Sequence, residues 1–183
     1  MTTSKRAFER AMRLAAVSGI RSTFGVALLE AAYNRPNRKY WAMAALGEAA
    51  VDKVPFAPSR AGLLGMLPRA AAGAYVANEV MAREGVQDPW IAPMGGAVAA
   101  GVGALASRAR GLLHAVGISG VMLGLAEDYF ALKVGGEAVG LSMDDLKAIG
   151  AETVDELKAH FQALMDDAQP KPVTPLTSPP VSA

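Results

Sequence analysis

Cysteine is absent from the 183-residue chain, which excludes disulfides, thiolate catalysis and cysteine-based zinc or iron–sulfur sites. Histidine occurs only twice, and neither a zinc-protease pattern nor a phosphate-binding loop is present. Aromatic residues make up 6% of the chain, and this scarcity disfavours a sheet. We therefore expect an all-α protein that is not an enzyme, with no catalytic residue, no metal site and no cofactor.

Charge is also scarce and unevenly placed. Charged residues make up 19% of the chain, below the roughly 25% of an average soluble domain. The net charge is +1, with basic residues gathered in 1–13 and acidic residues in 142–167. No strongly basic face results, so a nucleic-acid partner is not expected.

Apolar residues make up 52% of the chain and fall into segments of helical length. Residues 89–107 carry no charge over 19 positions, close to the ~20 residues that cross a ~30 Å hydrocarbon layer. Pro68 interrupts one segment, and the segment at 40–54 is short enough to be re-entrant. The pattern predicts a polytopic membrane helix bundle with four or five Gly/Ala-rich spanning or re-entrant helices. The expected segments are 7–33, 40–54, 60–83, 89–107 and 111–134.

The composition changes after Gly140, and this change divides the chain into three parts. Residues 1–140 form the predicted membrane helical domain. Residues 141–167 are acidic and amphipathic, and predict two short helices around Gly150 outside the bilayer. Residues 168–183 are rich in proline, which predicts a disordered tail.

Small residues recur four positions apart in the last two apolar segments. This spacing lets two helix backbones approach closely in lipid. The predicted helix-packing residues are Gly96, Ala100, Gly101, Gly103, Gly120 and Gly124.

The alternative to a membrane protein is a soluble, alanine-rich helical bundle. Only 89–107 is uninterrupted enough to favour a membrane span outright. That segment is apolar around its whole circumference, whereas a surface helix needs a polar face. Glycine-dense helices also lose roughly 1 kcal/mol per glycine relative to alanine in water. These two arguments favour the membrane.

A distinctive motif at 47–60 follows the pattern G-E-x-x-x-D-K-x-P-x-x-P-S-R. It resembles the signature of a bacterial membrane-protein family known as "domain of unknown function 4126". Three further stretches are similar to that family in order and spacing: G-x-R-S at 19–22, R-x-x-x-G-A at 69–74 and E-D-x-x-A at 127–131. The resemblance covers about residues 10–135. It implies a polytopic protein of the bacterial inner (cytoplasmic) membrane, and implies no reaction, substrate or cofactor.

Ionisable residues inside apolar segments are costly, at ~2.5–3.5 kcal/mol each on insertion scales, and persist when they pair or line a polar path. The predicted intramembrane charged site consists of Arg21, Glu48, Asp52, Lys53, Arg60, Arg69, Glu127 and Asp128.

Two functions fit these charges. One is a small-solute or ion transporter or channel-like protein, in which the charged site lines the path. The alternative is a non-catalytic structural or accessory membrane subunit, in which the charges lock the bundle. Such a subunit would bind partners through its small-residue helix faces and its acidic segment. The expected partners are the lipid bilayer and a second copy of the chain or another subunit of a membrane complex.

Overall fold

The computed structural model describes residues 3–51 and 63–167, and every regular element in these ranges is a helix. The prediction of an all-α fold is confirmed. The seven helices of the described ranges are α1 (Thr3–Ile20), α2 (Phe24–Ala32), α3 (Arg38–Val51), α4 (Leu63–Arg83), α5 (Ile91–Ala115), α6 (Gly120–Val139) and α7 (Met143–Asp167).

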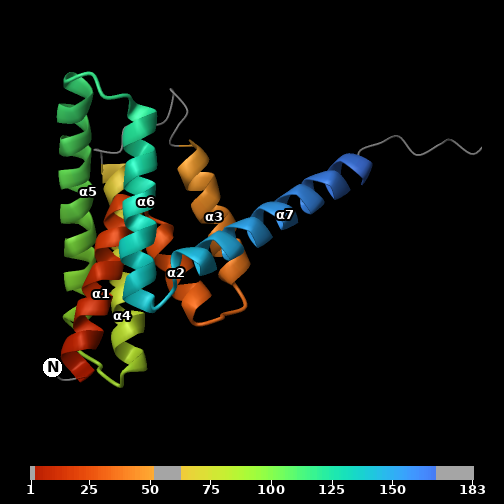
Figure 1. Ribbon diagram of the computed structural model, residues 1–183. Coiled ribbons are helices and arrows are strands. Elements are labelled where there is room, and N and C mark those ends of the chain that lie inside the picture. The colour runs from red at the N-terminus through yellow and green to blue at the C-terminus, as the bar shows by residue number, and fades with distance from the viewer. Residues whose placement is uncertain (1–2, 52–62, 168–183) are drawn as a thin grey trace, which may run out of the picture.

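The centre of the bundle is formed by α1, α4 and α5, which pack against one another more extensively than any other elements. Helix α6 lies along α1, and α2 and α3 form a second pair beside them, as Figure 1 shows. The core is built mainly from small and medium apolar side chains such as Ala11, Leu14, Val76 and Ala77. Small side chains allow the axes of these helices to lie close together.

Glycine permits direct backbone contact between α4 and α5. A Cβ atom at Gly95 would lie 2.5 Å from the carbonyl oxygen of Gly73, and a Cβ at Gly73 would lie 2.6 Å from that of Gly95. Between α1 and α5, a Cβ at Gly19 would lie 2.4 Å from the carbonyl oxygen of Ala99. No real Cβ tolerates such distances, so the three central helices meet at positions where only glycine fits.

The segment predicted as one helix at 7–33 is two helices, which corrects that prediction. Helix α1 ends at Ile20 and α2 begins at Phe24. The backbone N–H groups of Ser22 and Thr23 donate to the carboxylate of Glu48. This carboxylate satisfies the donors that a continuous helix would have used internally, so the break depends on a residue distant in sequence.

Two predicted interruptions are absent. Helix α4 continues through Pro68, which lies in its second turn, where the loss of one intrahelical hydrogen bond does not end the helix. The two short helices expected around Gly150 are one helix, α7, because a single helical glycine costs only about 1 kcal/mol. Tertiary contacts offset that penalty, since Leu146 packs against the core and Lys39 of α3 forms an ion pair with Glu156.

No helix within residues 3–51 and 63–167 combines the length and apolarity needed to cross a membrane. This includes α5, which contains residues 91–107 of the predicted span at 89–107. The helix does not stop at Arg108, as the sequence suggested, but continues to Ala115 and so includes Arg108 and Arg110. Its apolar part consists largely of alanine and glycine, which are only weakly hydrophobic.

Candidate functional site

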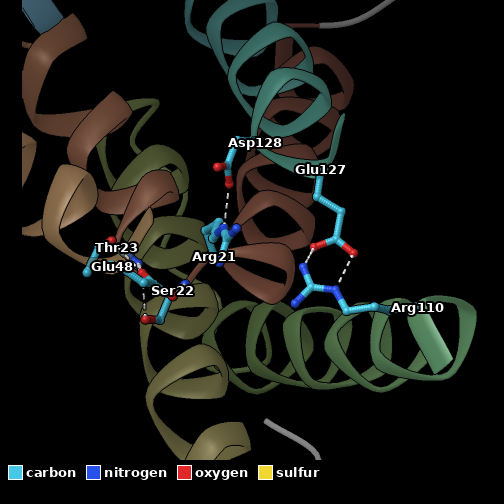
Figure 2. Close-up of polar contacts among 7 residues, drawn as sticks. All are labelled: Arg21, Ser22, Thr23, Glu48, Arg110, Glu127 and Asp128. Carbon is cyan, nitrogen blue, oxygen red and sulfur yellow. Dashed lines mark hydrogen bonds and ion pairs between the residues drawn. The ribbon is translucent and has the colours of Figure 1, made fainter. Parts of the chain in front are cut away.

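Five of the residues predicted for the charged site converge in the structure, although they come from separate elements. Figure 2 shows four of them beside Arg110 of α5. We call the set of six, including Arg110, the charge cluster. Its members are Arg21, Glu48, Arg69, Arg110, Glu127 and Asp128.

Arg21 lies at the centre of the cluster, in the break between α1 and α2. Its side chain has no solvent exposure, and its Nε atom donates to Oδ1 of Asp128 on α6 at 2.6 Å. Asp128 is itself buried. A charge-assisted hydrogen bond of this length in a buried setting ties the break in the chain to α6, 107 positions later.

Glu48 caps the N-terminus of α2 from α3. Its carboxylate accepts from the backbone N–H groups of Ser22 and Thr23, both at 2.9 Å, and from both of their hydroxyl groups. Thr23, at the N-cap position, makes no capping hydrogen bond of its own to the helix. A carboxylate beside unsatisfied N–H groups is stabilised by the positive end of the helix dipole. Glu48 therefore has a structural role that fixes α3 against α2.

Replacing Glu48 by alanine is expected to lower the free energy of unfolding by about 0.5–2 kcal/mol, the usual range for loss of a helix cap. Replacing it by glutamine keeps one acceptor oxygen and should lower stability less. Chemical denaturation of the two variants and the unmodified chain measures both values. Equal stability of all three proteins would contradict the capping role.

Arg69 and Arg110 complete the positive side of the cluster. Arg69 lies buried on α4, and burial lowers the pKa of its guanidinium, whereas the nearby negative charge of Glu48 raises it. Arg110 of α5 forms a two-point ion pair with Glu127 of α6, with Nε donating to Oε1 at 3.2 Å (Figure 2). Three cations and three anions thus gather where α3, α4, α5 and α6 approach the α1–α2 break.

The other predicted charged residues, Asp52, Lys53 and Arg60, lie outside the described residues. This applies also to most of the motif at 47–60.

Some of the predicted packing residues lie against a neighbouring helix and others do not. A Cβ at Gly96 would lie 3.1 Å from the carbonyl oxygen of Ala70, and one at Gly103 would lie 2.9 Å from that of Gly19. Gly124 faces the guanidinium of Arg21, and Ala100 is half-buried. For Gly101 and Gly120, no atom of the described chain lies within 4 Å of such a Cβ.

A second polar network, missed by sequence reasoning, joins α2 to α4. Buried Glu30 accepts from Arg35 at 3.0 Å and from the Tyr75 hydroxyl at 3.2 Å, and Arg35 also pairs with Glu79. The hydrogen bond to Glu79 raises the pKa of Arg35, and burial raises the pKa of Tyr75. The available signals were the single acid in the apolar stretch 24–32 and the four-residue spacing of Tyr75 and Glu79, which places them on one helix face.

Two cavities lined by described residues lie away from the charge cluster. One, of about 130 Å³, is apolar and lies between α2, α3, α6 and α7. The other, of about 470 Å³, is an open groove at the N-terminal end of α1, and we call it the cationic groove. Its lining residues are Arg6, Glu9, Arg10, Arg13, Glu137 and Ala138. Among residues 3–51 and 63–167, no group of three or more histidine or acidic side chains is arranged to hold a metal ion.

Comparison of the chain with protein-family models, curated proteins and solved structures gives no match. The arrangement of side chains is therefore the basis for a functional argument.

Proposed function

We propose that this chain is a membrane-associated helical protein with a structural, non-catalytic role. The observation that carries the proposal is that several charged side chains are buried while large apolar side chains are exposed. Arg21 is completely buried and Arg69 is 5% exposed, whereas Leu112 is 72% exposed and Val116 75% exposed. Proteins in contact with lipid place their ionisable groups towards the interior and their apolar groups outward.

The exposed apolar surface is larger than an ordinary soluble surface requires. Large apolar side chains are exposed on α3, α5, α6 and α7. Soluble monomers rarely expose extended apolar patches, and such patches mark contact with a membrane or a protein. The resemblance of the motif at 47–60 to a membrane-protein family supports the same conclusion.

The contacts of the charge cluster favour a structural role over a transport path. Asp128 is paired with Arg21, Glu127 with Arg110, and Glu48 with the N-terminus of α2. These contacts connect helices, as expected if the charges hold the bundle together. The multi-pass arrangement in the bacterial inner membrane, the transporter function and the partner subunits indicated by the sequence stay predictions.

The proposal is tested by fractionation and by flux. We expect the full-length chain, expressed in a bacterial host, to remain with the membranes after a high-salt wash, because apolar contacts are not screened by salt. Proteoliposomes containing the chain should show the same proton and potassium flux as empty liposomes. Glu48→Gln is the matched control for the flux assay, because it removes a cluster charge with little change of shape.

Two results would overturn the proposal. Recovery of the chain in the supernatant before any wash would exclude membrane association. Flux above that of empty liposomes, abolished by Glu48→Gln, would replace the structural role with transport.

A further inference from the structure

The turn that joins α5 to α6 lies at the end of the bundle opposite the marked N-terminus (Figure 1). We call residues 111–126, which include this turn, the hairpin tip. The tip contains no aspartate, glutamate, lysine or arginine over 16 positions. Charged residues adjoin it on both sides, with Arg110 before it and Glu127 after it.

The tip is exposed along most of its length, and only Leu123 and Gly124, near its base on α6, are buried. Every residue from 111 to 122 is exposed, and Leu112, Val116 and Met122 are 72%, 75% and 67% exposed. A Cβ atom placed at Gly111, or at Gly120 on the other helix, would meet no described atom within 4 Å. Over residues 111–122 the apolar surface therefore surrounds the hairpin instead of forming one face.

This geometry favours lipid as the occupant over a folded partner or a second copy of the chain. A docked protein buries one face of a helix pair and leaves the opposite face in water, where polar residues are expected. Lipid surrounds an inserted element completely. The tip has apolar side chains on both helices and in the turn, with Val116 and Ile118 among the exposed residues.

Several backbone N–H groups of the turn have hydrogen-bond partners within it. The N–H of Gly117 donates to the carbonyl of His114 at 3.0 Å, and that of Ile118 donates to Leu113 at 3.1 Å. At the start of α6, the N–H of Met122 donates to the hydroxyl of Ser119 at 3.2 Å. A turn in hydrocarbon needs such internal partners, because no water is present to supply them.

The size of the tip matches one leaflet and not a whole bilayer. Its α6 portion, residues 120–126, rises about 10 Å at 1.5 Å per residue. Interfacial elements bury their apolar side chains by roughly 5–10 Å, whereas the hydrocarbon core is about 30 Å thick. The Arg110–Glu127 ion pair then lies at the depth of the polar headgroups, where it joins the two helices below the inserted part.

We propose that the hairpin tip inserts into a single leaflet of a phospholipid bilayer. This inference rests on the proposed membrane association and names the segment that makes it.

Vesicle flotation of the full-length chain tests the proposal. The vesicles contain phosphatidylcholine and phosphatidylglycerol, and the tip variant is Val116→Glu with Met122→Glu. Loss of two apolar contacts should lower the partition coefficient by about 100-fold or more. The matched control is Phe161→Glu with Leu164→Glu on α7, which changes two similarly exposed residues away from the tip and should float like the unmodified chain.

A second measurement locates the tip directly. Because the chain has no cysteine, Val116→Cys provides a single labelling position for an environment-sensitive fluorophore. We expect a blue shift on addition of vesicles and quenching by lipids that carry a quencher on their acyl chains. A label at Phe161→Cys should show neither effect.

The outcomes separate this inference from the proposed function. If the unmodified chain does not float, membrane association fails and the inference fails with it. If the chain floats, but the tip variant floats equally and the label at position 116 stays in water, only the inference is overturned. If the label at position 116 shifts to the blue without vesicles, and only at concentrations at which size-exclusion chromatography shows a dimer, the tip binds a second copy of the chain and the inference is overturned.

Discussion

Replacing Arg21 by methionine is expected to lower the free energy of unfolding by about 3–5 kcal/mol, the usual loss when one partner of a buried ion pair is removed. The substitution leaves the buried carboxylate of Asp128 without the guanidinium that lies 2.6 Å from it. Burial of an uncompensated charge, more than loss of the attraction itself, causes the destabilisation. Chemical denaturation monitored by circular dichroism measures the change.

The double variant Arg21→Met with Asp128→Leu tests whether the two side chains stabilise the fold through their contact with each other. With both charges removed, stability should recover by a large part of the loss, because well-packed apolar residues often replace a buried ion pair without net destabilisation. If the double variant is as unstable as the sum of the two single variants, Arg21 and Asp128 are not coupled. That outcome would remove the bundle-locking role assigned to this pair.

Replacing Gly95 by alanine is expected to destabilise the fold by about 1–3 kcal/mol, the range for inserting a methyl group into a packed core. The new methyl group would lie 2.5 Å from both the carbonyl oxygen of Gly73 and the Cβ of Ala77. Since one of these neighbours is backbone, relief requires α4 and α5 to move apart. Thermal and chemical unfolding measure the loss.

Gly101→Ala on the same helix is the matched control. A methyl group there meets no described atom within 4 Å, so only helix propensity changes, which favours alanine by up to about 1 kcal/mol. The two substitutions are chemically identical and should shift stability in opposite directions. Destabilisation by Gly101→Ala of the same size as by Gly95→Ala would show that close helix contact is not the cause.

The all-α fold could be predicted because scarcity of aromatic residues and helical spacing of apolar residues are local properties of the sequence. The positions of helix ends were less predictable where distant residues determine them. The break after Ile20 depends on Glu48, and the continuity of α7 through Gly150 depends on contacts of Leu146 with the core. Neither partner could be identified from the neighbouring residues.

The charge cluster was largely predictable, because Arg21, Glu48 and Arg69 interrupt apolar segments and a buried charge needs a counter-charge. Arg110 was not assigned to it, since it lies beyond the charge-free stretch 89–107. The network of Glu30 and Arg35 was missed for a similar reason, as Arg35 lies in the break between two helices.

The packing glycines show the same limit. Four-residue spacing marked Gly96 and Gly101 alike, yet only Gly96 faces a neighbouring helix among the described residues. Gly73 and Gly95 lie where the backbones of α4 and α5 contact each other, but were not selected. Four-residue spacing shows which small residues share a face of one helix. It does not show which of those faces packs against a neighbouring helix, because that depends on the neighbour.

The length of α5 has a consequence for the opposite end of the molecule. With 25 residues, α5 is about 38 Å long, of which only residues 111–115 belong to the hairpin tip. The cationic groove lies at the N-terminal end of α1, near the opposite end of α5. There Arg10 of α1 forms an ion pair with Glu84, the residue that follows α4. A tip anchored in one leaflet holds the groove well beyond the ~10 Å over which salt solution screens the lipid charges. On this proposal the cationic groove would face the surrounding solution, away from the headgroups beneath the tip.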